Sequence, residues 1–337
     1  KMNKIAKTVL MTGTALCAAG VVLSTAGYFA GGKDFTYTSD HMYVSGGNSS
    51  SRKNLTVMKK EQIDDFTKLN VNFENFDLDI RTSDDDHYYM EYRLEKNGRK
   101  NPLIWKDKDG KLTLEESAGG SGSYYITYDL GVFSTHADLT EKKDALNTVI
   151  LYIPEKAQLS EAELQLSDGD LAADQLLCKE MTLELLNGDM MLDKGEFEKF
   201  DAKLSDGDLN VKELQCTDNM QLKSGNGDVT IKKAELADGQ IALSDGDIQI
   251  DNSSFNGDMK INSSCGDVSV EMKNGSAEKT NIYLKAADGD VDTEGLSRGK
   301  TDNEEDTSVY ENKAGASAPT LNVECSDGDI TLTESEK

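Results

Sequence analysis

The chain has 337 residues, 62 of them acidic and 36 basic, which gives a formal net charge of -26. This length suits two domains or one elongated array. The strong negative charge argues against nucleic acid as a partner and against docking on anionic lipid head groups. It suits a soluble surface that attracts cations or basic partners.

The chain begins with a segment, residues 8–32, that contains no charged side chain and follows Lys1, Lys4 and Lys7. These 25 uncharged residues are enough to span a bilayer. The lysine excess on the N-terminal side predicts a cytoplasmic stub at 1–7, a single-pass transmembrane anchor at 8–32 and an exported body.

Two other interpretations of this segment would also export the body. A cleaved signal peptide would end near Ser24-Thr25-Ala26, where small residues form a cleavage site. A lipoprotein would be modified at Cys17, but Leu16 before it is bulkier than the residue expected there. The apolar run is longer than the usual core of a signal peptide, so the sequence favours the uncleaved anchor.

Two further regions precede the main repeats. Residues 33–60 are polar, with Gly and Ser at their centre, and predict a flexible linker. Residues 61–160 alternate apolar and polar side chains and contain an Asp109-Gly110 hairpin signal, so we expect irregular β coils that cap the array. Aromatic residues here either pack in this cap or contact a partner; the candidates are Trp105, Tyr124, Tyr125 and Tyr128.

Residues 161–293 repeat a short phrase, Ser-Asp-Gly-Asp or Asn-Gly-Asp followed by an apolar residue. The first six glycines of the phrase are 19 or 20 residues apart, and two more follow after 23 and 39 residues. A fixed period of this size is typical of a solenoid, in which each repeat forms one coil. We expect a turn at each of these glycines, which are Gly169, Gly188, Gly207, Gly227, Gly246, Gly266, Gly289 and Gly328.

Apolar residues recur at fixed distances from the glycines. The positions five before are Leu164, Leu183, Ala202, Leu222, Ile241, Ile261, Leu284 and Val323, and those two after are Leu171, Met190, Leu209, Val229, Ile248, Val268, Val291 and Ile330. Apolar or small residues at a spacing of two on each side predict two short strands with a bend between them. The remainder of each coil is polar with one bulky apolar residue, so we expect a looser third side.

The same Asp-Gly turns would also suit a series of antiparallel hairpins. Hairpins would not keep a period of 19–20 residues with the same columns inward, so we predict an all-β, single-stranded β-solenoid. Residues 294–319 are rich in Asp, Glu, Asn, Gly and Ser and predict an acidic insertion loop at the position of one coil. Residues 320–337 then form the terminal coil.

An aspartate follows every one of these glycines: Asp170, Asp189, Asp208, Asp228, Asp247, Asp267, Asp290 and Asp329. Carboxylates stacked about 4.8 Å apart repel one another, so their charge needs stabilisation. Hydrogen bonds from turn N–H groups would provide it, and so would calcium between the coils. The phrase lacks the nine-residue spacing of calcium-binding β-rolls, so we expect hydrogen bonding and no metal. The calcium alternative uses Asp170, Asp189, Asp208, Asp228 and Asp247.

No pattern in the sequence indicates a catalytic centre or a cofactor site. His41, His87 and His136 lie outside the repeats, and Arg298 is the only arginine after residue 160. A β-helix enzyme acting on polysaccharides would use an asymmetric pair of carboxylates, not the same aspartate in every coil, and is the weaker alternative. We expect a non-catalytic protein that binds a cell-envelope glycan or protein through an extended face, with the insertion 294–319 as a second candidate contact.

The strand ending at Ile153-Pro154, and the phrase at 164–171 with its repeats, resemble the bacterial "putative adhesin" β-strand-repeat family of unknown function. The resemblance covers about residues 61–337, and eight phrases in register make it specific. It implies a β-solenoid at the bacterial cell surface, with an N-terminal membrane segment and an adhesin-like or scaffold role. The acidic insertion after Val291 departs from the family's pattern.

Overall fold

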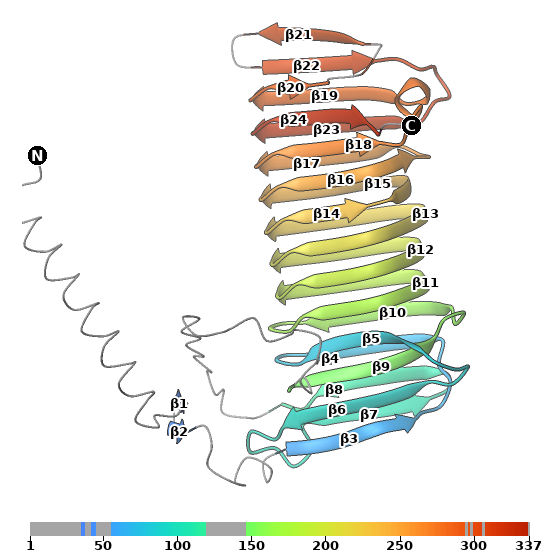
Figure 1. Ribbon diagram of the computed structural model, residues 1–337, viewed down its shortest axis with the longest axis vertical. Helices are drawn as coiled ribbons and strands as arrows, with labels where there is room; N and C mark the ends of the chain where they lie inside the picture. Colours follow the sequence, from blue (N-terminus) through green and yellow to red (C-terminus); the bar gives the residue numbers. More distant parts are fainter. Residues whose placement is uncertain are drawn as a thin grey trace, which may run out of the picture. The chain divides into compact units, whose positions relative to one another are not determined.

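The computed structural model describes residues 35–37, 42–44, 55–118, 146–293, 296, 299–304 and 307–335. The chain divides into two compact units, Lys1–Leu55 with Gly119–Lys142, and Thr56–Ala118 with Lys143–Lys337. In the first unit, β1 (Phe35–Tyr37) pairs antiparallel with β2 (Met42–Val44). The second unit is a stack of β coils (Figure 1).

The middle of the stack consists of parallel strands, each of which, except the last two, is paired with the strand one coil further along the chain. They are β10 (Leu159–Leu166), β11 (Leu171–Asn187), β12 (Met190–Asp206), β13 (Leu209–Asn226), β14 (Val229–Lys232), β15 (Ala234–Asp245), β16 (Ile248–Phe255), β17 (Met259–Cys265) and β18 (Val268–Met272). Leu164 pairs with Leu183, and Leu183 with Ala202, so one period of the sequence forms one coil of the stack. The all-β fold and its 19–20 residue coils are therefore confirmed.

One hydrophobic core runs through the stack. All of the residues five before the glycines are buried, and so are those two after, apart from Val291, which is partly buried. On the third side, β11, β12 and β13 continue as strands with Leu176, Phe197 and Leu214 inward. This side is still the looser one, as predicted, because the register shifts between parallel coils fall on it, at 197–199, 216–219 and 250–253.

The N-terminal end of the stack does not follow chain order. It contains β3 (Leu55–Gln62), β4 (Lys68–Phe73), β5 (Asp77–Ser83), β6 (Tyr89–Glu95), β7 (Leu103–Lys108), β8 (Lys111–Glu116) and β9 (Thr148–Pro154). The coil β4–β5 lies between β8–β9 on one side and β10–β11 on the other, with all four pairings parallel. Antiparallel β7 and β6 then pair with β8 and β9, and β3 pairs with β6. The first six residues of β3 belong to the segment predicted as a linker.

The C-terminal end uses the same arrangement. It contains β19 (Asn281–Asp288), β20 (Val291–Asp292), β21 (Lys300–Glu304), β22 (Thr307–Asn312), β23 (Thr320–Asp327) and β24 (Ile330–Glu334). The final coil β23–β24 lies between β17–β18 and β19–β20, so the coil of Gly328 stacks directly on that of Gly266 and not beyond that of Gly289, as chain order predicted (Figure 1). The insertion, predicted as a loop, instead contains the hairpin β21–β22, which pairs antiparallel with β19.

The predicted anchor at 8–32 lies outside the described residues. Within the described part of the chain, no helix has the length and apolar character needed to cross a membrane. The one helical element described there is a short 3-10 turn at Ala277–Lys279.

Candidate functional site

The glycine phrases of successive coils stack into one long corner of the solenoid, which we call the aspartate corner. In spatial order its aspartates are Asp77, Asp170, Asp189, Asp208, Asp228, Asp247, Asp267, Asp329 and Asp290. The Oδ1 atom of each accepts a hydrogen bond from the backbone N–H of the next, at 2.8–3.0 Å. These bonds link neighbouring coils, so the aspartates stabilise the stack through turn N–H groups, as expected.

The glycines are required by the close approach of the coils. Gly207 has a φ of +137°, and a Cβ built on it would overlap the carbonyl oxygen of Gly188 in the preceding coil. The same overlap with backbone oxygen recurs at every glycine of the phrase, including Gly169, where the oxygen belongs to Phe76. Because backbone cannot move aside like a flexible side chain, another residue would separate the coils at this corner.

A second column, just before the glycines, relieves its repulsion differently. Asn187 donates its Nδ2–H to Asp168 Oδ1 at 2.7 Å, and Asn226 donates to Asp206 Oδ1 at 2.5 Å. An amide therefore separates successive carboxylates, because Asp and Asn alternate along this column from Asp168 to Asp245. The interleaved final coil breaks this pattern, because Asp327 stacks directly against Asp288.

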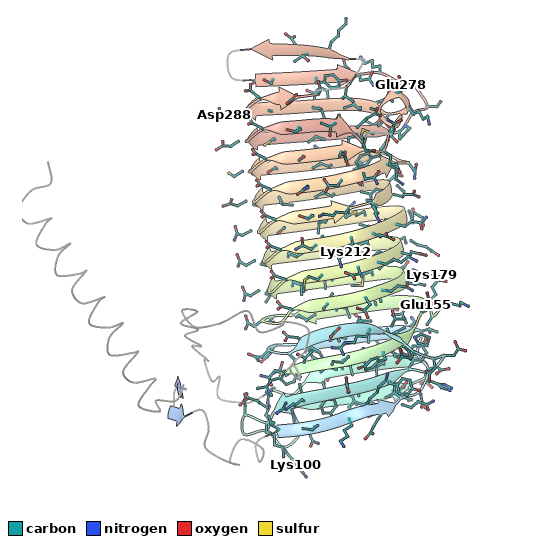
Figure 2. All side chains as sticks on the ribbon, viewed as in Figure 1. Lys100, Glu155, Lys179, Lys212, Glu278 and Asp288 are labelled. Atoms are coloured by element: carbon teal, nitrogen blue, oxygen red, sulfur yellow. The ribbon has the colours of Figure 1, made fainter. Side chains whose placement is uncertain are left out.

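The aspartate corner and the opposite edge of the coils differ in charge. No described Lys or Arg forms an ion pair with an aspartate that follows a phrase glycine. On the edge opposite, coils are joined by exposed ion pairs such as Lys199–Glu180 at 3.2 Å and Lys179–Glu198 at 3.2 Å. Figure 2 shows Asp288 and Lys179 projecting from opposite edges. In the described parts of the chain, no group of His, Cys, Asp and Glu side chains is arranged to hold a metal ion.

The insertion creates an open groove of about 390 Å³ near the C-terminal end. It is lined by β19, β22 and the segment that follows β22, with Ile282, Tyr283, Glu311, Lys313 and Ala316 among its residues. Lys313 Nζ lies 2.8 Å from Glu311 Oε1, so a charged pair stands beside a partly exposed aromatic ring. Such a mostly apolar concavity with a few polar groups has the size and character of a small-ligand site.

One side chain fixes the far wall of this groove. Asn281 Oδ1 accepts the N–H groups of Ala314 and Gly315, and its Nδ2 donates to the carbonyl oxygens of Gly315 and Ala318. The four bonds satisfy the whole amide and hold the segment after β22 against β19. The groove is therefore built on a rigid strand and not on an independent loop.

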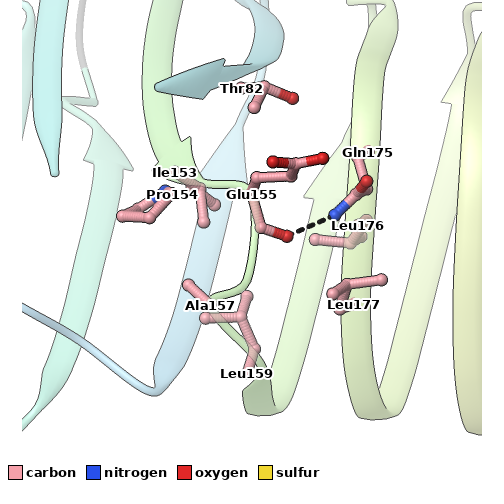
Figure 3. A pocket seen from close by; sticks show the side chains of 9 residues that line it. All are labelled: Thr82, Ile153, Pro154, Glu155, Ala157, Leu159, Gln175, Leu176 and Leu177. Carbon is pink, nitrogen blue, oxygen red and sulfur yellow. Dashed lines mark hydrogen bonds between the residues drawn. The ribbon is translucent and has the colours of Figure 1, made fainter. Parts of the chain in front are cut away.

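A smaller cavity lies where β9 meets the third side of coil β11 (Figure 3). It measures about 10 Å³ and is lined by Ile153, Pro154, Ala157 and Leu176, with Gln175 Nε2 donating to the Glu155 carbonyl oxygen at 2.6 Å. A volume of that size holds at most one water molecule. We therefore assign it to packing.

The other residues that the sequence singled out are dispersed. Trp105 is 39% exposed on β7, at the N-terminal end, whereas Tyr124, Tyr125 and Tyr128 lie outside the described residues. The four described cysteines are free thiols, and burial raises the pKa of Cys178 to about 12, so its reactive thiolate is disfavoured.

The sequence pattern did not identify Asp77, the first aspartate of the aspartate corner. Phe76 stands before it in place of a glycine, so the phrase is unrecognisable. The alternation of Leu78 and Ile80 after it, at the spacing of Leu171 and Ala173, was the signal that could have found it.

Comparison with known proteins places this architecture. The family profile of Toastrack DUF4097 matches residues 66–333, which is most of the chain. The chain belongs to this family. The family assignment agrees with the resemblance seen in the sequence, and the Toastrack fold is the stack of coils described above. No curated protein shows significant similarity to the chain.

Several solved structures resemble this member of the Toastrack family. One is a "putative adhesin" from Parabacteroides distasonis ATCC 8503, 16% identical, with a TM-score of 0.46 over 83% of this chain and 97% of that one. Another is a "putative adhesin" from Parabacteroides merdae ATCC 43184, 14% identical, with a TM-score of 0.41 over 86% and 98%. A third is a "putative lipid binding protein" from Parabacteroides distasonis ATCC 8503, 12% identical, with a TM-score of 0.42 over 84% and 97%.

Proposed function

We propose that the protein is a membrane-anchored, extracytoplasmic binding module of the bacterial cell surface, adhesin-like and without catalytic activity. The observation that carries the binding role is the groove beside Tyr283, which is built by an insertion that the regular array does not need. A rigid strand with an aromatic ring and a charged pair suits a cell-envelope glycan or a protein segment. The aspartates of the phrase, in contrast, are engaged in holding coils together.

A binding screen of the full chain against cell-wall glycans and envelope proteins tests this proposal. Tyr283→Ala and Lys313→Ala should each weaken binding of any ligand found. Lys212→Ala is a matched control, because Lys212 is 70% exposed and paired with Asp193, much as Lys313 is 76% exposed and paired with Glu311. Equal binding by all three variants would remove the groove from the contact site.

Topology and catalysis are tested separately. Protease shaving of intact cells should digest the body, and N-terminal sequencing should recover residues 1–32. A mature chain that starts near Gly27 would replace the anchor by a cleaved signal peptide and leave the export standing. Turnover of envelope polysaccharides by the purified protein would replace the binding role by an enzymatic one.

A further inference from the structure

Exposed apolar side chains gather at the N-terminal end of the stack. Val57 on β3 is 58% exposed, and on β7 Ile104 is 43% and Trp105 39% exposed. Among the described strands β7 pairs in register only with β8, so its second edge faces outward at the end of the array. Trp105 shares a face with buried Leu114, and Ile104 projects from the opposite face, so both flank that edge.

Lysines accumulate on the outer face of the same two strands. Lys106 and Lys108 alternate with inward residues on β7, and Lys108 lies directly opposite Lys111 on β8. Lys111 in turn lies beside Lys68 on β4. Like charges directly opposite on neighbouring strands are destabilising, so stability of the sheet does not account for this row.

Carboxylates neutralise this row only in part. Lys68 pairs with Glu161 at 2.7 Å, whereas the contact of Lys108 with Asp109 is 3.7 Å long between side chains that are 84% and 85% exposed. Lys106 and Lys111 have no ion pair within the described residues. Lys100, also exposed, projects from the same end in Figure 2.

We propose that this lysine end, formed by Lys100, Ile104, Trp105, Lys106, Lys108 and Lys111, docks on the anionic head groups of a lipid bilayer. Lysines beside an exposed tryptophan and an aliphatic residue are the composition of interfacial membrane contacts. The net charge of the whole chain argues against lipid docking, and Asp107, Asp109 and Glu115 stand among these lysines. The docking contact is therefore restricted to the outward side chains of Lys106, Lys108 and Lys111, while the aspartate corner is repelled by the membrane.

Docking rests on the proposed function in one respect. Each contact is weak, and an N-terminal anchor would keep the lysine end at a high effective concentration near the lipid. β3, which begins at Leu55, is the first strand of the stack along the chain, and it pairs with β6 at this same end.

The single tryptophan of the chain is a built-in probe, since all tryptophan fluorescence comes from Trp105. The full-length protein is reconstituted in vesicles of phosphatidylcholine, with or without phosphatidylglycerol, that carry brominated acyl chains as quenchers. We expect quenching and a blue shift with phosphatidylglycerol, both reversed by high salt. The double variant Lys106→Gln/Lys108→Gln should lower the ratio of docked to free ends about 30-fold, from about fivefold per lysine. The double variant Lys212→Gln/Lys260→Gln should leave it unchanged.

The outcomes separate docking from its alternatives. Quenching that is equal with and without phosphatidylglycerol, or unchanged in Lys106→Gln/Lys108→Gln, overturns the proposal. A blue shift that depends on protein concentration and not on lipid would assign the surface to a second copy, which also overturns it. Loss of every variant from the vesicles after a high-salt wash would contradict the anchor and not the docking, because the Trp105 signal before the wash still reports on the lysine end.

Discussion

The two ends of the stack are closed by the same strand arrangement, although their sequences are unrelated. At each end the coil nearest the chain terminus, β4–β5 or β23–β24, lies one position inside the array, between two other coils. An antiparallel strand then pairs with the outermost coil, β7 with β8 and β22 with β19. The N-terminal end presents lysines and a tryptophan, whereas the C-terminal end presents an insertion hairpin beside a groove.

This arrangement protects the ends of an open solenoid from fraying. A terminal coil in a simple stack is held on one side only, and it is also the end of the chain. Here each chain-terminal coil is held on both sides, and each outermost coil is connected at both of its ends. Local opening of an outermost coil therefore produces a closed loop, which gains less entropy than a free chain end.

The two ends also differ in how the turn is held. The coil β4–β5 lacks the glycine phrase, and Glu116 from β8 accepts the backbone N–H groups of Glu74 and Asn75 at 2.8 and 2.6 Å. Glu116 is paired with Arg99, and both side chains are nearly fully buried. The buried and fully paired carboxylate of Glu116 therefore holds the turn of β4–β5, where the glycine phrase is absent.

Removal of residues 320–337 should have the largest effect on this comparison, because it empties the slot between β17–β18 and β19–β20. The deletion removes five buried side chains: Leu321, Val323, Cys325, Ile330 and Leu332. Each large buried side chain contributes about 2–5 kcal/mol, so we expect β19–β22 to unfold while β10–β16 stay folded. Hydrogen exchange measures this, with removal of residues 1–54 as the control. Continued protection of β19–β22 would show that the outermost coil stays folded without β23–β24.

Buried charge tests whether the interleaved coil is as well integrated as the middle of the array. Ile248 in β16 is 1% exposed and Ile330 in β24 is 0% exposed, although Ile330 lies near the chain end. Ile248→Asp and Ile330→Asp should each cost several kcal/mol of unfolding free energy, as should Leu209→Asp, because each buries an unpaired charge. Chemical denaturation measures the loss, and Asn210→Asp, on an exposed position beside Leu209, should be nearly neutral. A much smaller loss for Ile330→Asp would mean that the final coil frays.

The regular coils were predictable from the sequence because each residue column faces the same surroundings in every coil. The buried columns, the glycine turn and the aspartate hydrogen bonds all follow from that repetition. The order of the coils was not predictable, since Gly289 and Gly328 carry the same phrase and nothing local tells which of them stacks on Gly266. The groove beside Tyr283 was not predictable either, because it forms only when the hairpin β21–β22 folds back on β19.

Substitution of a corner glycine should separate backbone crowding from backbone conformation. Gly188 and Gly315 have nearly the same positive φ, +154° and +156°, but a Cβ at Gly315 would meet nothing within 4 Å, whereas one at Gly188 would overlap the carbonyl oxygen of Gly169. Gly315→Ala should cost about 2 kcal/mol from its dihedral angles alone. Gly188→Ala should cost about 3–4 kcal/mol, because the coils must also move apart. Thermal unfolding compares the two, and equal losses would mean that the corner adjusts without cost.

Substitutions in the aspartate corner should have a smaller effect on stability, which depends on the position of the aspartate in the stack. The carboxylate of Asp208 accepts the N–H of Asp228 at 2.8 Å, whereas the carboxylate of Asp290, the last in the aspartate corner, accepts no hydrogen bond from a described residue. Asp208→Ala should cost about 1 kcal/mol, and Asp290→Ala close to nothing. Asp208→Asn keeps an acceptor oxygen and should recover most of the loss. Chelation should leave the Tm unchanged, and a large saturable rise with calcium would make this corner a metal site.

The smallest expected effect belongs to the N-terminal end alone. Asp107 on β7 faces inward with a buried Oδ2 atom that has no hydrogen-bond partner, and desolvation, followed by the charge of Asp64, raises its pKa. Since the folded-state pKa lies above the unfolded one, this carboxyl favours folding below the unfolded pKa, and that contribution is lost as pH rises through the folded pKa. Asp107→Asn should therefore stabilise the protein at neutral pH by about 0.5 kcal/mol, a small gain because solvent screens this carboxyl, and the gain should shrink on acidification. Thermal unfolding from neutral to acidic pH measures the difference, with exposed Asp109→Asn as the control. A gain that is the same at every pH would assign the effect to packing of the amide.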